Sequence, residues 1–119
     1  MPRQILLADD SATIARMVQI TFAHEDYTVT AVKSGEEAIA RARGSRPDVV
    51  LVDAGLQGPG GRNGYDLCAD IRAAGVRDVP VLLLTNNFVP YDEARGQRSG
   101  ADGFVVKPFE TQALIDRVA

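Results

Sequence analysis

The sequence predicts one α/β domain, a three-layer α/β/α sandwich built around a five-stranded parallel sheet. Two patterns carry this prediction. Short apolar runs rich in branched residues recur along the 119 residues, and such runs are typical of buried parallel strands. Segments with helical apolar spacing separate the runs, which implies right-handed crossovers with helices on both faces of the sheet.

The first two strands and helices follow directly from this alternation. The run 5–8 is the first strand, and Ser11 is an N-cap candidate for the helix after it. The apolar stripe of that helix comprises Ile14, Met17, Val18 and Phe22. Residues 27–32 form the second strand, and Ser34 with Glu37 makes a capping-box pattern that opens the second helix.

The next strand and helix are bounded by proline and glycine. The third strand follows Pro47 and covers the run 49–52. The third helix is expected over 64–74, where Gly75 stops it. Its inward residues are Leu67, Cys68 and Ile71. A fourth strand then follows Pro80.

The last third of the chain completes the alternation. Pro90 suits the first turn of a fourth helix, which Gly100 ends. The fifth strand is the short run 104–106, and the fifth helix starts after Pro108 and Phe109. Its inward residues are Leu114, Ile115 and Val118. The sequence stops inside this helix without a C-cap, so we expect residues 1–119 to be a domain clipped from a longer protein.

Composition narrows the class of protein. A chain with 45% apolar and 24% charged residues is typical of a soluble globular domain. The net charge of −3 gives no reason to expect binding of nucleic acid or of a membrane surface by this domain. No apolar stretch approaches the roughly 18 residues of a membrane span. A single cysteine, Cys68, forms no internal disulfide and fits a reducing cytoplasm.

Five polar residues follow the predicted strands. Asp9 and Asp10 come after the first strand, Asp53 after the third, Thr85 after the fourth and Lys107 after the fifth. Ligands bind at the carboxyl ends of the strands in open parallel sheets. We therefore expect three carboxylates, a hydroxyl and an amine to meet at one edge of the sheet as a reaction site.

The chemistry of this set favours phosphoryl transfer. A trio of carboxylates repels itself and favours a hard divalent cation such as Mg²⁺, which also partners phosphate. One aspartate can then attack phosphorus, with Lys107 and Thr85 contacting phosphoryl oxygens. His24 lies away from the strand ends, so neither a Ser/His/Asp hydrolase nor a Cys/His protease has support.

Each of these residues also has a plain structural interpretation. Asp9 and Asp10 are suitable helix caps, Asp53 is a suitable turn residue, and Thr85 and Lys107 suit exposed loops. Their coincidence at four strand ends favours a site over these separate roles. The glycine-rich segment after Asp53 lacks the Gly-Lys-Ser/Thr ending of a P-loop, and we interpret it as a mobile insertion.

Four motifs resemble the response-regulator receiver domain of two-component signalling. They are Leu7-Ala8-Asp9-Asp10-Ser11, the run Val49 to Asp53, Leu84-Thr85, and the segment Gly100 to Phe109. The resemblance covers essentially the whole chain, and the four motifs together are highly specific. It implies the flavodoxin-like receiver fold, with sheet order 2-1-3-4-5.

The resemblance also implies a role for each matching acidic residue. Asp53 is the implied phosphoacceptor. Asp10 and Asp53 are implied direct ligands of Mg²⁺, Asp9 a ligand largely through water, and the backbone carbonyl of Gly55 the remaining protein ligand. A histidine kinase or phosphotransfer protein is the implied phosphodonor.

The implied conformational switch involves the last two strands. Thr85 and Phe104 match the family's switch pair, and Pro108 matches a proline whose peptide bond is cis in the family. The implied signalling face comprises the fourth helix, fifth strand and fifth helix. Tyr91, Arg95 and Arg98 are our candidates for exposed contacts on it.

The sequence departs from the family in two places. The segment Gly55 to Gly64 is about three residues longer than the usual loop after the acceptor, and it lacks the family's hydrophobic-Pro pair. Asn86 follows Thr85 where the family favours a small residue. Asn86 can narrow the entrance to the acceptor or add a hydrogen bond to the phosphoryl group.

Three other functions compete with this interpretation. A flavodoxin-like carrier shares the topology, but Asp9 and Asp10 would repel a flavin phosphate. An aspartyl-phosphate phosphatase generally carries its nucleophile on the first strand, whereas Asp53 follows the third. A docking module that is never phosphorylated is the main alternative.

We therefore predict a cytoplasmic, Mg²⁺-dependent switch in a two-component phosphorelay. It catalyses its own phosphorylation and dephosphorylation and turns over no external substrate. Expected partners are the phosphodonor protein, an output domain or effector protein, and a second copy in a phosphorylation-dependent homodimer.

Overall fold

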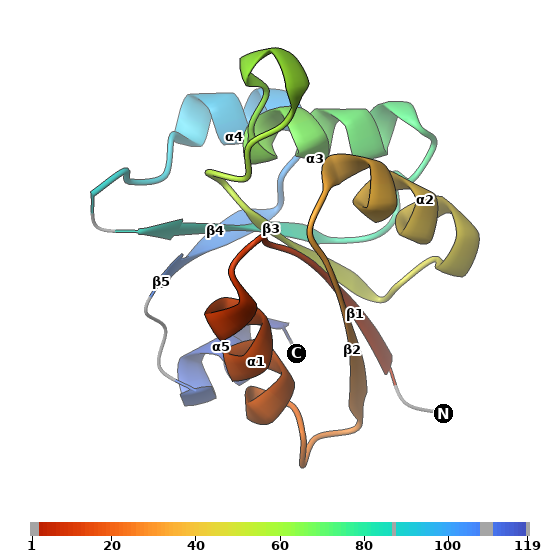
Figure 1. Cartoon of the computed structure of the whole chain (residues 1–119), viewed down its shortest axis with the longest axis vertical. Coiled ribbons are helices and arrows are strands. Elements are labelled where there is room, and N and C mark those ends of the chain that lie inside the picture. The colour runs from red at the N-terminus through yellow and green to blue at the C-terminus, as the bar shows by residue number, and fades with distance from the viewer. Residues whose placement is uncertain (1–2, 87, 108–110, 119) are drawn as a thin grey trace.

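A computed structural model shows a five-stranded parallel sheet between two layers of helices (Figure 1). The structure describes residues 3–86, 88–107 and 111–118. The strand order is β2-β1-β3-β4-β5, and every neighbouring pair is parallel. Both the predicted α/β/α class and the order implied by the resemblance are therefore confirmed.

The strands and helices alternate along the chain, with one short 3₁₀ helix, η1, in the third crossover. The strands are β1 Arg3–Ala8, β2 Tyr27–Val32, β3 Val49–Asp53, β4 Val81–Asn86 and β5 Gly103–Lys107. The helices are α1 Ala12–Thr21, α2 Gly35–Ser45, η1 Pro59–Gly61, α3 Gly64–Ala73, α4 Glu93–Ser99 and α5 Thr111–Val118. Within the described part of the chain, no helix has the length and apolar character needed to cross a membrane.

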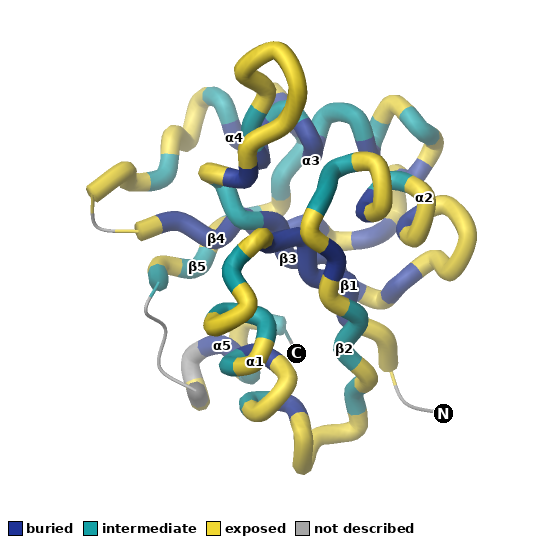
Figure 2. The backbone as a smooth tube through the Cα atoms, in the orientation of Figure 1, coloured by how far each residue is buried: buried dark blue, intermediate teal, exposed yellow. Residues whose placement is uncertain are grey.

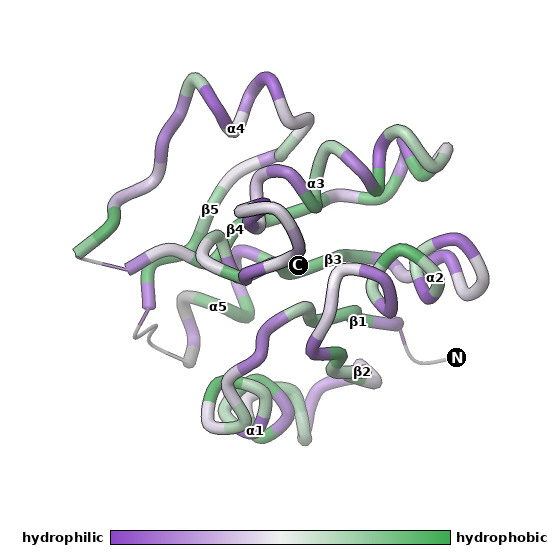
Figure 3. Tube along the Cα trace, turned by 45° about the horizontal axis from the view of Figure 1, so that its top comes forward, coloured by the Kyte–Doolittle hydropathy of each residue, from purple (hydrophilic) through white to green (hydrophobic). Residues whose placement is uncertain are grey.

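Each face of the sheet has its own hydrophobic core. Successive strand residues point to opposite faces, so Val50 and Val52 pack under α2 and α3, while Leu51 packs against α1 and α5. The central strands β1, β3 and β4 are the most buried part of the chain (Figure 2). Along the helices, hydrophilic and hydrophobic residues alternate, as expected for helices with one buried face (Figure 3).

Side chains cap the first three long helices. The Ser11 hydroxyl accepts a hydrogen bond from Ile14 N at the start of α1, as predicted. For α2 the structure shows one half of the predicted capping box, in which the Ser34 hydroxyl accepts from Glu37 N. A complete capping box occurs instead at α3, between Asn63 and Asp66.

The predicted start of the fourth helix is wrong. Pro90 lies before α4, which begins at Glu93 after an N-cap by Asp92. The reason is that Tyr91 packs inward, and the Asp92 N–H donates to the hydroxyl of Tyr65 on α3 rather than entering a helix. The helix end at Gly100 is confirmed, since this glycine has a φ of 83°.

Candidate functional site

The three predicted carboxylates lie together at the carboxyl edge of the sheet. Asp9 and Asp10 follow β1, and Asp53 ends β3, which pairs directly with β1. One carboxylate oxygen from each residue lies within 4.8 Å of the others. Asp9 is buried, Asp53 is half-buried and Asp10 is exposed, so the cluster opens to solvent on one side.

Asp9 is the most buried member of this cluster. Its Oδ1 accepts a hydrogen bond from Ser11 N at 2.9 Å, and only 2% of the residue is exposed. Burial raises the pKa of Asp9; the Ser11 N–H opposes that rise, and the negative charge of Asp53 adds to it. A buried carboxylate that has lost its hydration is stabilised by a cation beside it. The N-cap of α1 is Ser11, not Asp10.

Lys107 supplies a cation from the end of the edge strand β5. It lies at the end of β5, beside Asn86 of β4, and its side chain extends past β4 to reach two other strands. The Nζ atom lies 3.4 Å from Asp53 Oδ1 and 3.2 Å from Asp9 Oδ2. One ammonium group therefore links the ends of β1, β3 and β5.

The backbone after Asp53 turns sharply around its carboxylate. Gly55 N donates to Asp53 Oδ1 at 3.1 Å, and Leu56 N donates to the Asp53 carbonyl at 3.0 Å. Gly64 N, at the start of α3, donates to the Ala54 carbonyl at 3.0 Å. Carboxylate oxygens of three side chains gather beside this turn, and Mg²⁺ prefers hard oxygen ligands of this kind.

Thr85 contributes a buried hydroxyl next to this edge. Asp53 pairs with Leu84 across β3 and β4, so Thr85 lies one residue beyond the partner of Asp53. Only 2% of Thr85 is exposed, and its Oγ1 has no hydrogen-bond partner among the described residues. Leaving a buried hydroxyl unpaired costs about 1–3 kcal/mol, so this group is well suited to a partner that arrives later.

The segment between β3 and α3 is an Ω-type loop that projects from the molecule (Figure 1). Gly58 N donates to the Arg62 carbonyl at 2.9 Å, which closes the loop across η1. Arg62 also pairs with Asp70 of α3 at 2.6 Å. A cleft of about 320 Å³ lies between this loop, α2 and α3. None of the three clustered carboxylates lines the cleft.

The side-chain carbonyl of Asn86 accepts hydrogen bonds from the loop that follows β4 and is not directed at the carboxylate cluster. Its Oδ1 accepts from Phe88 N at 2.9 Å and from Val89 N at 2.7 Å. This turn leaves both apolar side chains exposed, Phe88 at 94% and Val89 at 67%.

The second member of the predicted switch pair lies at the surface. Phe104 is 41% exposed and stacks on Tyr91, with ring centroids 4.4 Å apart. Tyr91 is half-buried, and its predicted exposure is wrong. Arg95 is also half-buried and pairs with Asp66, whereas Arg98 is exposed as predicted. Pro108 lies outside the described residues.

The predicted start of α3 at Gly64 is confirmed, but sequence reasoning missed the Asn63 cap and the close approach of Gly64 to Asp53. A Cβ built on Gly64 would overlap the Asp53 carbonyl oxygen and lie 2.7 Å from Ala54 Cα, so α3 starts directly against the backbone of Asp53 and Ala54. The Asn63–Asp66 capping pattern was the available signal for this start.

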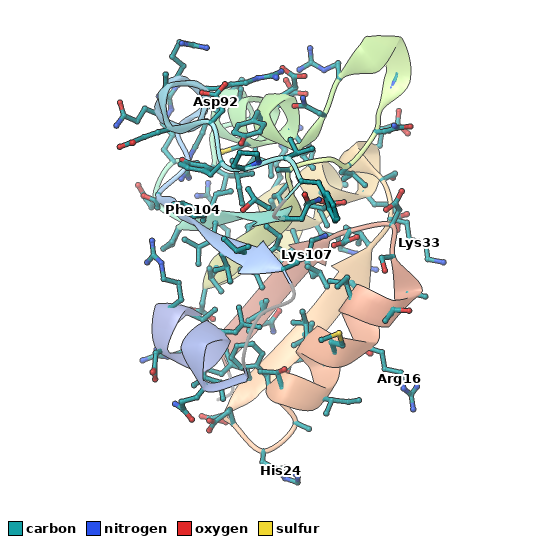
Figure 4. The ribbon with its side chains drawn as sticks, turned by 90° about the vertical axis from the view of Figure 1, so that its left-hand side faces the viewer. Arg16, His24, Lys33, Asp92, Phe104 and Lys107 are labelled. Carbon is teal, nitrogen blue, oxygen red and sulfur yellow. The ribbon has the colours of Figure 1, made fainter. Side chains whose placement is uncertain are left out.

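The one histidine lies where the sequence places it. His24 is in the turn after α1, far from Lys107 (Figure 4). It therefore takes no part in the chemistry of the carboxylate edge.

The arrangement can hold a divalent cation and an incoming phosphoryl group. Three carboxylates offer hard oxygen ligands, Lys107 offers a point charge and Thr85 offers an unpaired donor among the described residues. No histidine or thiol accompanies them, since His24 is remote and Cys68 is buried between α3 and α4.

Comparison with known proteins gives one consistent result. The family model of the response regulator receiver domain matches residues 5–119. The chain is 36% identical over 118 residues to the DNA-binding response regulators MtrA of Mycobacterium tuberculosis and Mycobacterium leprae. These matches cover 99% of this chain but 50% of each relative, so the chain spans about half the length of the curated relatives it matches.

Solved structures agree with the family match. The chemotaxis protein CheY4 of Vibrio cholerae has a TM-score of 0.87 and 30% identity, covering 99% of this chain and 97% of that one. The receiver domain of the Francisella response regulator 1452 has a TM-score of 0.82 and 28% identity, covering 98% and 93%.

Proposed function

This chain belongs to the response regulator receiver domain family of two-component signalling, and we propose that it is a phosphorylatable switch whose acceptor is Asp53. In this proposal residues 1–119 form the receiver domain, which works in the cytoplasm. The phosphodonor is a histidine kinase or a histidine phosphotransfer protein.

The transfer step needs one nucleophile and several groups that position charge. A carboxylate oxygen of Asp53 attacks the phosphorus of a phosphohistidine. The O–P bond forms while the P–N bond breaks, and the imidazole keeps the electron pair. Lys107 Nζ, now 3.4 Å from Asp53 Oδ1, then pairs with a phosphoryl oxygen.

The carboxylate cluster fits a divalent cation. Asp10 and Asp53 would hold Mg²⁺ directly, with Asp9 acting largely through water and the Gly55 carbonyl as a further ligand. When bound, Mg²⁺ offsets the repulsion between these carboxylates and the phosphoryl oxygens. In dephosphorylation, water attacks the phosphorus of the aspartyl phosphate, the bond between phosphorus and the Asp53 oxygen breaks, and inorganic phosphate leaves Asp53 as a free carboxylate, so the domain acts only on its own modification.

One observation carries the proposal: the Lys107 ammonium bridges Asp53 and Asp9 at the edge where the buried Thr85 hydroxyl has no partner among the described residues. Separate capping and turn residues do not need a lysine that crosses a strand. They also do not explain a buried hydroxyl at the same edge that lacks a hydrogen-bond partner among the described residues.

The readout follows from the Thr85 hydroxyl. A phosphoryl group on Asp53 supplies the acceptor that Thr85 lacks among the described residues, and the charge-assisted hydrogen bond draws Thr85 toward it. Phe104 then turns inward into the vacated space. The face of α4, β5 and α5 consequently changes shape, and an effector protein, an output domain or a second copy of the chain recognises it. The matched MtrA proteins are DNA-binding response regulators, and any nucleic-acid contact in our proposal belongs to such an output domain.

The acceptor assignment is tested by mass spectrometry after incubation with acetyl phosphate and Mg²⁺. We expect one added phosphoryl group that is labile to base, and its complete loss in Asp53→Asn. Asp48→Asn is the matched control, since Asp48 is exposed, lies before β3 and should leave labelling unchanged. Undiminished labelling of Asp53→Asn would refute the assignment.

The competing docking-module function makes the opposite prediction. A receiver that only docks takes up no phosphoryl group from acetyl phosphate or from any histidine kinase. The phosphorylatable form is favoured because one edge of the sheet carries all of the residues that the reaction needs, namely Asp9, Asp10, Asp53, Thr85 and Lys107.

A further inference from the structure

Three aromatic rings from three different parts of the chain form a continuous stack beside β5. Tyr65 belongs to α3, Tyr91 precedes α4, and Phe104 belongs to β5. The Tyr65 and Tyr91 centroids are 6.1 Å apart with planes 25° from parallel. Tyr91 and Phe104 are closer, at 4.4 Å and 13°. Tyr91 is therefore the central ring.

Contacts with α3 fix the position of Tyr91. The neighbouring Asp92 N–H donates to the Tyr65 hydroxyl at 2.8 Å. The Arg95 guanidinium lies 5.1 Å from the centroid of the Tyr65 ring and pairs with Asp66 at 3.4 Å. Both contacts tie the start of α4 to α3, and α3 begins against the backbone at the end of β3.

Gly96 provides the space for the Tyr91 hydroxyl. A Cβ built on Gly96 would overlap that hydroxyl, so any larger residue would displace the ring. Glycine inside a helix is otherwise unfavourable, and α4 has only seven residues. The glycine is thus explained by the ring that packs on it.

Phe104 packs on Tyr91 at the surface of the edge strand. It is 41% exposed and, unlike tyrosine, has no hydroxyl with which to hydrogen-bond at the surface. Its neighbour on the same face of β5, Val106, is also exposed, at 39%, so this face of the edge strand is poorly covered. Tyr91 is the aromatic contact that the structure shows for Phe104 among the described residues.

We propose that Tyr91 is a positioning residue that holds Phe104 outward before phosphorylation, and that Gly96 is the space that allows it. This inference rests on the proposed function, in which Phe104 turns inward when Asp53 is modified. The stack lowers the population of the inward state in the unmodified protein, so the switch stays off until the phosphoryl group arrives.

Three single substitutions separate the stack from helix stability. Tyr91→Leu removes the central ring. Gly96→Ala displaces the ring while improving the helix propensity of α4. Tyr91→Phe keeps the ring and removes only the hydroxyl, and it is the matched control. A purely structural role for Gly96 predicts a changed thermal melt in Gly96→Ala and no change at Phe104.

The readout is ¹⁹F NMR of the full chain labelled with 4-fluorophenylalanine. The chain has four phenylalanines, and loss of a resonance in Phe104→Leu assigns position 104. Spectra are recorded with and without beryllofluoride and Mg²⁺, a phosphoryl mimic. We expect the mimic to shift the wild-type Phe104 resonance.

In the absence of the mimic, Tyr91→Leu and Gly96→Ala should move this resonance part of the way to the mimic-bound position. Their affinity for beryllofluoride should rise about two- to tenfold, the range expected from one aromatic pair. Tyr91→Phe adds a fifth labelled phenylalanine and therefore a fifth resonance, but its Phe104 resonance and its affinity for beryllofluoride should match the wild type.

The two failures are distinguishable. If the wild-type Phe104 resonance does not shift when beryllofluoride and Mg²⁺ are added, both the proposed function and this inference are overturned. A wild-type resonance that responds, with Tyr91→Leu and Gly96→Ala unchanged in position and affinity, overturns this inference alone.

Discussion

At the scale of single residues, a substitution of Asp10 distinguishes a metal-binding role from a helix-capping role. Its carboxylate is exposed, lies within 4.8 Å of those of Asp9 and Asp53, and has no capping role, because Ser11 caps α1. Replacing Asp10 should therefore remove like-charge repulsion without loss of a helix cap.

We expect Asp10→Ala to lower Mg²⁺ affinity by at least about tenfold and to slow phosphorylation by acetyl phosphate. Its melting temperature without Mg²⁺ should equal or exceed that of the wild type. Thermal melts across a Mg²⁺ titration measure both quantities. A loss of about 1 kcal/mol in unfolding free energy with unchanged Mg²⁺ affinity would instead support the capping interpretation.

Cys68 gives a prediction about pH. Burial raises the pKa of this thiol to about 11. Because the folded state disfavours the thiolate, the contribution of Cys68 to stability is complete below its ordinary pKa near 9 and is lost as the pH rises toward 11.

The free energy of unfolding should consequently fall between about pH 8 and pH 11 by about 2 kcal/mol more in the wild type than in Cys68→Ala. Urea titrations at several pH values measure this difference, and comparison with Cys68→Ala removes the titration of other groups. Parallel pH profiles in the two proteins would contradict a buried, protonated thiol.

At the scale of elements, the start of α3 packs against the backbone of Asp53, the proposed acceptor. Gly64→Ala places a methyl group against the Asp53 carbonyl and Ala54 Cα, so α3 or the end of β3 must shift. We expect a loss of about 1–3 kcal/mol in unfolding free energy and slower phosphorylation of Asp53.

Gly44→Ala is the matched control for this substitution. Gly44 lies within α2, and apart from its chain neighbours and the backbone of the helix itself, no atom of the described residues lies within 4 Å of the point that an alanine methyl group would occupy. The change should therefore stabilise the protein by about 0.5–1 kcal/mol. Urea unfolding and acetyl phosphate labelling compare the two variants. Equal, small effects would mean that α3 adjusts without moving the acceptor.

At the scale of the whole molecule, the proposed switch couples the carboxylate edge to the edge strand of the sheet. Thr85 lies on β4, one residue beyond the partner of Asp53, whereas the exposed ring of Phe104 lies on the neighbouring edge strand β5. Thr85→Ala should leave phosphorylation largely intact, because the hydroxyl is not the nucleophile, but it should weaken the response of α4.

Hydrogen exchange across α4 and β5, with and without beryllofluoride and Mg²⁺, measures this coupling. The wild type should show different protection in the two states, and Thr85→Ala a smaller difference. Identical exchange in both states of the wild type would make the domain a phosphate acceptor without a switch.

Much of this architecture was predictable because it is encoded locally. Apolar runs marked each strand, capping residues marked the start of α1 and α2, and Gly75 and Gly100, both with positive φ, marked helix ends. Because ligands bind at the carboxyl ends of parallel strands, the strand pattern placed Asp9, Asp10 and Asp53 at one edge of the sheet, and the strand order implied by the family resemblance brought them together. Their roles in phosphorylation stay predictions until labelling tests them.

Tertiary packing decided the features that depend on residues far apart in the chain. Pro90 predicted an early start for α4. The Asp92 N–H instead donates a hydrogen bond to the Tyr65 hydroxyl on α3, and α4 begins at Glu93. Likewise, Arg72 donates to carbonyls before β4 and after α4 and pairs with Asp102 at 2.9 Å, although nothing near it in sequence indicates those partners.

The same distinction applies to side-chain direction. A strand pattern fixes which face a residue occupies, because successive side chains alternate. It does not fix the conformation of a loop residue such as Tyr91 or the reach of a lysine such as Lys107, because these depend on neighbours that only the folded chain supplies. The sequence by itself determined the sheet and the carboxylate edge, and the tertiary structure decided how Lys107 spans that edge and how Tyr91 stacks on Phe104 at the surface.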